Sequence, residues 1–271
     1  MVGLNLVFKK IRKKIGTFLP FTKKIRDHYF EYRIFATPEN LNLFKKMQTG
    51  KLDTSDPIPI KLSPSLSKYP LYCRPNTSDH TVLWTTFAKK YHLPIRKLGS
   101  SANILDLGVN IGSTILHLNH EYPDAFIVGV EMDKGNFEVA KLNTSVIKDS
   151  CDLLNKAVWC RDELVTYSGK NEESFAITGK SNDSISIEAT TISRVIEQYG
   201  WNKVDYVKMD IEGAEMVIFE NDLSWLNKVK QINLEIHDFG KIEFFINKLQ
   251  SSGFKVRHHK THWSGIYGFR L

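Results

Sequence analysis

The stretch ILDLGVNIGS, residues 104–113, decides the fold of this 271-residue chain. An apolar strand ends near Asp106, Gly108 and Gly112 bracket a turn, and Ser113 opens a helix. Glycines let the backbone turn sharply and approach a ligand closely, and the first amides of a helix offer hydrogen-bond donors. The spacing therefore predicts a strand, a ligand-binding turn and a helix.

Two further positions indicate which ligand this turn binds. The dinucleotide pattern G-x-G-x-x-G needs a second glycine where the pyrophosphate meets the backbone, and Asn110 stands there instead. A side chain at that place fits the aminoacyl tail of an S-adenosyl compound better than a pyrophosphate. Glu131 follows 23 residues after Gly108, at the end of the next apolar run, where an acid can accept both hydroxyl protons of a ribose. Together these positions predict an adenosyl-binding site.

Apolar runs alternate with helical patterns after residue 100, which predicts an α/β fold with a mainly parallel sheet. The predicted strands are residues 103–107, 126–131, 152–154, 205–209, 232–236, 255–258 and 265–270, and the predicted helices are residues 113–121, 135–147, 192–199, 214–219 and 241–251. The last two strands predict an antiparallel hairpin at the C-terminal end. Residues 184–189 alternate in period two and predict an additional strand that pairs near residues 164–167.

The positive charge is concentrated at the N-terminal end. Residues 1–50 hold eleven Lys and Arg against three acids, a net +8, whereas the whole chain has a net charge of +7. Apolar residues interleave with basic ones at helical spacing in residues 4–15 and again in residues 25–35. These segments are interpreted either as helices packed on the core with a solvated basic face, or as a contact with an anionic membrane surface or a polyanionic substrate.

The chain is expected to have three parts: a basic helical appendage and linker over residues 1–60, a pre-core strand and helix over residues 61–100, and a catalytic α/β domain over residues 101–271. Four prolines in residues 50–70 predict an irregular connector, and a helix is expected from Asp79 with Ser78 or Asp79 as its cap. Three cysteines without metal-ligand spacing indicate reduced thiols. Since no signal peptide or long apolar run is found, we expect a cytoplasmic protein, with peripheral membrane contact as an alternative.

Four strings carry a resemblance to a known family. LYCRPNTSDH (71–80), LDLGVNIGS (105–113), VDYVKMDIEGAE (204–215) and INLEIHDF (232–239) resemble the FkbM-type methyltransferases, S-adenosylmethionine-dependent enzymes that mostly methylate hydroxyl oxygens of sugars and glycosylated natural products. The likeness runs from about residue 70 to residue 260, and Val109 stands where many members have alanine. It implies a Rossmann-like class I methyltransferase fold, with S-adenosyl-L-methionine as cofactor and a sugar, glycan or polysaccharide hydroxyl as acceptor.

The resemblance also implies roles for individual residues. The cofactor-binding residues expected from it are Asp106, Gly108, Asn110, Gly112, Glu131, Ala157 and Asp210, with Val158, Asp152 or Asn155 nearby. The catalytic residues expected are Asp210, Glu212 and His237. Asp210 and His237 are the candidate general bases, because a carboxylate or an imidazole at the carboxyl end of a strand can take the proton of a hydroxyl. Glu212 or Glu235 would orient the substrate, and the alternative for His237 is a histidine bonded to a neighbouring loop.

Other chemistries are weighed against this hypothesis. Asp210, Glu235, His237 and Asp238 form an oxygen-rich group that suits a divalent cation, but no metal is predicted. His258, His259 and His262 are expected to be exposed or packed within the hairpin.

The rival functions are an RNA or other nucleic-acid methyltransferase, a non-catalytic cofactor-binding scaffold, and an NAD-dependent oxidoreductase. Nucleic acid is not expected as a partner, because the acids of DIEG (210–213) repel phosphates and the positive charge lies outside the catalytic domain.

Overall fold

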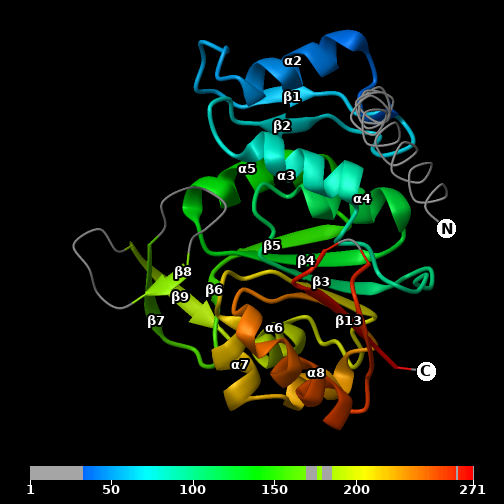
Figure 1. Cartoon of the computed structure of the whole chain (residues 1–271), viewed down its shortest axis with the longest axis vertical. Coiled ribbons are helices and arrows are strands. Elements are labelled where there is room, and N and C mark those ends of the chain that lie inside the picture. The colour runs from blue at the N-terminus through cyan, green and yellow to red at the C-terminus, as the bar shows by residue number, and fades with distance from the viewer. Residues whose placement is uncertain (1–32, 169–175, 179–184, 261, 271) are drawn as a thin grey trace, which may run out of the picture.

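The computed structural model describes residues 33–168, 176–178, 185–260 and 262–270 (Figure 1). The helix predicted in residues 4–15 lies outside these ranges, as does all but the end of the one predicted in residues 25–35. Within the described ranges, no helix is both long and apolar enough to cross a bilayer.

A seven-stranded sheet forms the centre of the molecule and confirms the predicted α/β fold. Its strand order is β12-β13-β11-β10-β3-β4-β5. Strands β11, β10, β3, β4 and β5 run parallel, while β13 is antiparallel to both β11 and β12, as the predicted hairpin requires. The strands are β3 (Asn103–Leu107), β4 (Phe126–Glu131), β5 (Cys151–Asn155), β10 (Tyr206–Met209), β11 (Gln231–Glu235), β12 (Lys255–His258) and β13 (Gly265–Phe269).

Among the five parallel strands, the chain reverses its direction of travel across the sheet once, and this reversal determines where a ligand can bind. From β3 it steps outward to β4 and β5, then returns to place β10 on the other side of β3. In open parallel sheets, ligands bind outside the carboxyl ends of the strands at such a switch point. The loop that follows β3 stands at this point.

Helices cover both faces of the sheet, with α3, α4 and α5 on one side and α6, α7 and α8 on the other (Figure 1). They are α3 (Asp79–Trp84), α4 (Ser113–Glu121), α5 (Lys134–Thr144), α6 (Ile192–Gln198), α7 (Glu215–Asn221) and α8 (Ile242–Ser251). Side-chain caps explain where two of them begin. Asp133 accepts the backbone N–H of Asn136 at the start of α5, and Thr191 accepts that of Arg194 at the start of α6.

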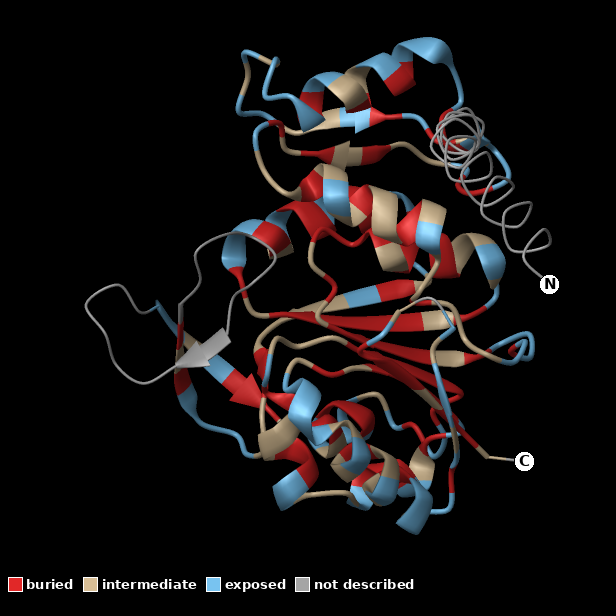
Figure 2. Cartoon of the chain, in the orientation of Figure 1, coloured by how far each residue is buried: buried red, intermediate tan, exposed pale blue. Residues whose placement is uncertain are grey.

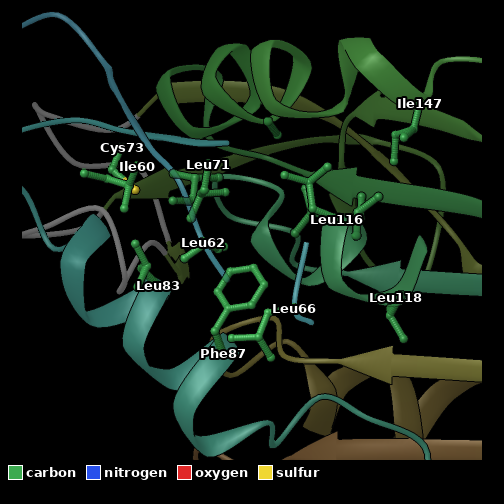
Figure 3. Packing of buried hydrophobic residues seen from close by; sticks show 14 of the residues in the cluster. Ile60, Leu62, Leu66, Leu71, Cys73, Leu83, Phe87, Leu116, Leu118 and Ile147 are labelled. Carbon is green, nitrogen blue, oxygen red and sulfur yellow. The ribbon is translucent and has the colours of Figure 1, made fainter. Parts of the chain in front are cut away.

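Two apolar clusters fill the space between the sheet and its two helical layers. Alternate side chains of a strand point to opposite faces, so Ile104 packs in the first cluster while Leu105 and Leu107 pack in the second. The central strands are buried almost throughout, whereas the outer helices expose one face (Figure 2). Figure 3 shows part of the first cluster, to which Phe87, Leu66 and Leu116 contribute from separate segments of the chain.

The segment that precedes the sheet shares this first cluster. Helix α2 (Pro38–Gln48) and the antiparallel strands β1 (Ile58–Ile60) and β2 (Leu71–Cys73) contribute the buried residues Phe44, Ile60 and Leu71. Asn143 of α5 also bonds both backbone groups of Tyr72 in β2. The apolar core therefore continues from this segment into the sheet.

The helix expected from Asp79 begins there, and Ser78 occupies the predicted N-cap position, but no side chain caps the helix. The side chain of Ser78 makes no cap hydrogen bond. The hydroxyl of Thr77 accepts the backbone N–H of Asp79 instead, at 3.2 Å. The carboxylate of Asp79 is fully buried and bonds the backbone N–H and the guanidinium of Arg74. It is therefore held by a cation rather than turned toward the helix end.

A second sheet confirms the additional strands predicted between the third and fourth core strands. It has the order β6-β9-β7-β8, with β7 antiparallel to β8 and β9. Its strands are β6 (Ala157–Val158), β7 (Leu164–Ser168), β8 (Ala176–Thr178) and β9 (Ile185–Thr190). Because β6 follows β5 directly, this sheet adjoins the edge of the central one.

Candidate functional site

A cavity of about 320 Å³ opens at the carboxyl ends of β3, β4, β10 and β11. Its walls come from the glycine loop, from the ends of these strands, from the hairpin of β12 and β13, and from a π-helical turn at Thr85–Lys89 that continues α3. Among the predicted site residues, five line it: Gly108, Asn110, Glu131, Asp210 and Glu212. The fold thus brings residues from three separate parts of the sequence to one place.

The glycine loop approaches the end of β10 so closely that it excludes any side chain at residue 108. A Cβ atom on Gly108 would lie 1.8 Å from the carbonyl oxygen of Asp210, and the residue has a φ of +82°. Asn110 also adopts a left-handed conformation, with a φ of +50°, and its side-chain oxygen accepts the N–H of Ile111 at 2.8 Å. Such strained backbone is concentrated at ligand sites.

Glu131 is buried at the end of β4 and holds the glycine loop. Its carboxylate accepts the backbone N–H of Asn110 at 2.8 Å and that of Asp133 at 2.9 Å. Burial raises the pKa of Glu131 to about 7, although these two hydrogen bonds favour the ionised form. The loop and the acid, recognised separately in the sequence, therefore form one bonded unit.

Lys208 is a buried cation of the site that the sequence did not reveal as functional. Its Nζ lies 2.6 Å from the carbonyl oxygen of Gly108, 3.4 Å from Asp106 Oδ1 and 3.6 Å from Asp210 Oδ2. Burial alone would lower the pKa of Lys208, but the carboxylates of Asp106 and Asp210 raise it overall. Lys208 therefore stays charged and joins the two acids.

Asp106 lies beneath the cavity and is fully buried. Burial raises the pKa of Asp106, while Lys208 and the hydroxyl of Thr114 oppose the shift. The side chain supports the loop from below and is not part of the cavity wall.

Asp210, Glu212 and His237 come together at the ends of β10 and β11. His237 Nε2 lies 3.6 Å from Asp210 Oδ1 and 3.3 Å from Glu212 Oε2. Its Nδ1 lies 2.8 Å from Oε1 of Glu215, which is buried at the start of α7. Glu212 has a φ of +52°, a second strained residue beside the cavity.

The charge state of His237 bears on its expected role. Burial would lower the pKa of His237, but the hydrogen bond to Glu215 and the surrounding carboxylates raise it to about 9. Burial raises the pKa of Glu212 to about 7. His237 is therefore protonated at neutral pH in this arrangement, which works against its role as general base and leaves Asp210 as the better candidate.

The hairpin contributes two histidines that sequence reasoning placed outside the site. His259 and His262 line the cavity, whereas His258 is exposed. His262 Nε2 lies 3.3 Å from Oε1 of Glu235, and its ring packs edge-on against Tyr91 with centroids 4.4 Å apart. Burial lowers the pKa of His262, whereas burial raises that of Glu235 to about 8. An imidazole that is neutral at pH 7 therefore faces the cavity.

Two other predicted cofactor residues lie beside the cavity rather than on its wall. Gly112 has a φ of +78°, and a Cβ there would lie 3.2 Å from the backbone of Ala140, so this glycine lets α4 start against α5. Ala157 is a buried residue of β6 that packs with Val165 and Ala189 of the second sheet, and its neighbours Lys156 and Val158 line the cavity instead.

The remaining polar residues named from the sequence have local partners. Asp152 accepts the hydroxyl of Tyr199 at 2.6 Å, and the side-chain amide of Asn155 donates to the carbonyl of Glu131 at 2.8 Å. Asp238 caps the 3-10 turn that follows β11 through the N–H of Gly240. Among the described residues, the group that could hold a metal ion consists of Asp210, Glu212 and His237 and does not include Asp238.

Residues 106–256 match the family model described as the methyltransferase FkbM domain. No curated protein matches the chain. Among solved structures, the precorrin-6y C5,15-methyltransferase of Geobacter metallireducens GS-15 has 11% identity and a TM-score of 0.41, over 65% of this chain and 83% of that chain. The METTL16 methyltransferase domain has 10% identity and a TM-score of 0.43, over 73% of this chain and 70% of that chain. A chain of the fibrillarin/Nop5p complex has 18% identity and a TM-score of 0.38, over 65% of this chain and 76% of that chain.

Proposed function

The chain belongs to the FkbM methyltransferase family, and from that premise we propose that it transfers a methyl group from S-adenosyl-L-methionine to a hydroxyl oxygen of a sugar, a glycan or a glycosylated metabolite. The observation that carries the proposal is that one cavity is lined both by Gly108 and Glu131, which suit an adenosyl cofactor, and by the acids Asp210 and Glu212.

Gly108 and Glu131 fit an adenosyl cofactor. Gly108 has no side chain where the loop meets Asp210, so the loop can pack against the end of β10 and still line the cavity. The carboxylate of Glu131 lines the cavity and can accept the two hydroxyl protons of a ribose. Val158 offers an apolar surface at the position expected for the adenine, in place of Ala157, which lies beneath the wall.

The acids Asp210 and Glu212 suit the deprotonation of an acceptor hydroxyl. S-adenosylmethionine supplies a methyl group that is already activated on a sulfonium sulfur. The chain must therefore hold the acceptor oxygen in line and take its proton. Asp210 lies on the cavity wall, with its Oδ2 3.6 Å from Lys208 Nζ, and its carboxylate can act as the base. His237 Nε2 lies 3.6 Å from Asp210 Oδ1 and 3.3 Å from Glu212 Oε2, so this side chain can orient both carboxylates.

Cofactor binding is tested first. S-adenosylhomocysteine is expected to raise the Tm of the purified full-length chain, whereas NAD leaves it unchanged, because only a ligand that binds the native state stabilises it. E131Q should lose most of this shift. E188Q is the matched control, since Glu188 is an exposed acid whose carboxylate pairs with Lys156. A chain that is folded and not stabilised by S-adenosylhomocysteine would refute the proposal.

The acceptor is tested with methyl-labelled S-adenosylmethionine. Glycans extracted from cells that lack this protein are incubated with the purified chain, and mass spectrometry follows the gain of one labelled methyl group. D210N should abolish the gain while cofactor binding persists. Incorporation into RNA in a parallel sample would instead favour the nucleic-acid alternative, and no incorporation by a cofactor-bound chain would favour the non-catalytic scaffold.

We also propose a cytoplasmic location with peripheral contact between residues 1–35 and an anionic membrane surface, supported by the basic charge of this segment. These residues lie almost wholly outside the described ranges. Co-sedimentation with vesicles that contain 30% anionic lipid, with and without residues 1–32, tests the contact; Ile34 and Phe35 are kept because they are buried in the core. Equal sedimentation of both chains would exclude the contact.

A further inference from the structure

Asp210 and Glu212 on the cavity wall and the nearby His237 offer ligand atoms of the kinds that divalent cations bind. One atom each from Asp210, Glu212 and His237 can be chosen such that all lie within 4.8 Å of one another. Two ligands that lie 2.1 Å from an octahedral cation are about 3.0 Å apart when adjacent and about 4.2 Å apart when opposite. The separations of 3.6 Å and 3.3 Å from His237 Nε2 to the two carboxylates fall between these values. Small side-chain movements would therefore let all three contact one ion.

The imidazole of His237 is held in the orientation that metal-binding histidines require. Its Nδ1 lies 2.8 Å from Oε1 of Glu215, whose side chain is 2% exposed. The same oxygen accepts the backbone N–H of Ile211 at 3.3 Å, which anchors the carboxylate. Histidines that ligate metals generally donate their other ring N–H to a carboxylate in this way, which leaves the lone pair of the ligating nitrogen directed at the ion. Glu215 therefore directs Nε2 toward Asp210 and Glu212 independently of these two residues.

Asp210 is also oriented from its opposite side. Its Oδ2 lies 3.6 Å from Lys208 Nζ, while its Oδ1 lies 3.6 Å from His237 Nε2. One oxygen is thus engaged with a buried cation and the other is directed at the histidine. Both Asp210 and Glu212 line the cavity, so an ion held between them would have open coordination positions on the cavity side.

We propose that Asp210, Glu212 and His237 form a binding site for a divalent cation with octahedral coordination, of the Mn²⁺ or Mg²⁺ class. Two carboxylates and one imidazole from the protein leave three positions for water or for oxygen atoms of a substrate. The role of the ion rests on the proposed function: an acceptor hydroxyl bound to the ion loses its proton more readily, since a bound cation lowers the pKa of an attached oxygen.

A simpler arrangement has to be distinguished from this one. Without an ion, the imidazolium of His237 pairs with the three surrounding acids, whereas a bound ion would replace the proton on Nε2, which is released to solvent. Acidic groups beside a cavity also attract cations diffusely. A specific site binds one ion through a fixed set of ligands, so its affinity falls only when one of these ligands or its support is replaced. A diffuse negative field binds several ions weakly, and replacement of any neighbouring acid lowers the affinity by a similar factor. Glu235 separates these cases, because it is an acid of the same cavity and its carboxylate contacts His262 instead of His237.

The test is Mn²⁺ binding to the full-length chain, followed by electron paramagnetic resonance in the presence of saturating S-adenosylhomocysteine. It is run under nitrogen at about pH 8.5, so that Glu235, whose pKa is raised to about 8, is mostly ionised. We expect one Mn²⁺ per chain, displaced by excess Mg²⁺. E212Q should weaken binding by more than about tenfold, and E215Q by about tenfold, because the latter leaves all three ligands in place but frees the imidazole. E235Q should change the affinity less than about threefold.

Two results would overturn the proposal. Absence of bound Mn²⁺ at millimolar concentration is one, and an equal loss of affinity in E235Q and E212Q is the other. If E212Q does not fold, E215Q supplies the same comparison with E235Q. S-adenosylhomocysteine binding is measured by calorimetry in the same samples. A chain that binds this compound and no Mn²⁺ refutes the cation site alone, whereas a chain that binds neither refutes the proposed function as well.

Discussion

The Nζ of Lys208 lies 2.6 Å from the carbonyl oxygen of Gly108, so a buried cation ties strand β10 to the loop that follows β3. Lys208 and Asp106 are also direct partners in the register of the two strands. The cation therefore neutralises a fully buried carboxylate and fixes the loop in one interaction. The glycine loop and the signature of β10 depend on each other through this contact.

Removal of the Lys208 charge should destabilise the fold. K208M leaves the carboxylate of Asp106 buried without its cation, which costs about 3–5 kcal/mol of unfolding free energy. K203M is the control, because Lys203 is half exposed and its ion pair with Asp205 is worth less than about 1 kcal/mol. Urea denaturation measures both; equal midpoints for the two variants would contradict the prediction. D106N in addition to K208M should recover part of the loss.

A methyl group at residue 108 should abolish cofactor binding. G108A places its Cβ against the carbonyl of Asp210, so β3 and β10 must separate at the edge of the cavity. G200A is the matched control, since Gly200 has a φ of +63° and no atom within 4 Å of its added Cβ. It should cost only the left-handed conformation, about 1–2 kcal/mol. Calorimetric titration with S-adenosylhomocysteine checks the pair, and binding by G108A comparable to that by G200A would be inconsistent with the crowding.

Glu131 should make the stability of the protein depend on pH. Its folded pKa is raised from 4.5 to about 7, so its contribution is fully present below pH 4.5 and is lost as the pH rises through 7. The shift corresponds to a fall on the order of 3 kcal/mol in the unfolding free energy across that window. The difference between the wild-type and E131Q profiles, from urea titrations at several pH values, isolates this contribution. E188Q should follow the wild-type profile; a flat difference for E131Q would show that Glu131 is not perturbed.

Asn143 should prove essential to the junction between β2 and the glycine loop. Its amide bonds the backbone N–H of Tyr72 at 2.7 Å and the carbonyls of Tyr72 and Ile111 at 3.0 Å and 2.8 Å. N143A leaves these buried groups without partners, at a cost of about 3 kcal/mol. N221A removes an exposed bond to the carbonyl of Val217 and should cost less than about 1 kcal/mol. Similar denaturation midpoints for both variants would count against this role.

The sequence predicted the sheet well because its strands are strongly apolar and are separated by clear helical periods. Residues 103–107 and 126–131 form β3 and β4 with the predicted bounds. The absence of a side-chain cap on α3 was not predictable in the same way. Its placement depends on Asp79 meeting the guanidinium of Arg74, and the spacing alone favours a cap at Ser78 or Asp79.

Prediction of the site was limited by contacts that depend on strand order and register. The sequence alone does not indicate a role for Lys208, because its contact with Asp106 depends on the pairing of β10 with β3. His262 lies beyond the end of β12, so alternation along that strand does not say where its side chain points. Gly108, Asn110 and Glu131 were recognisable because the loop and the acid have a fixed spacing along the chain, which the fold preserves.

The division of the interior between two faces of one sheet has a consequence for protein synthesis. Among the described residues, the first cluster draws every buried member from residues 34–151 except Tyr206. The second cluster needs strands β10, β11 and β13, which leave the ribosome last. Since a domain generally folds as a unit, the apolar residues of the first cluster emerge early and stay accessible to chaperones until these last strands have been synthesised.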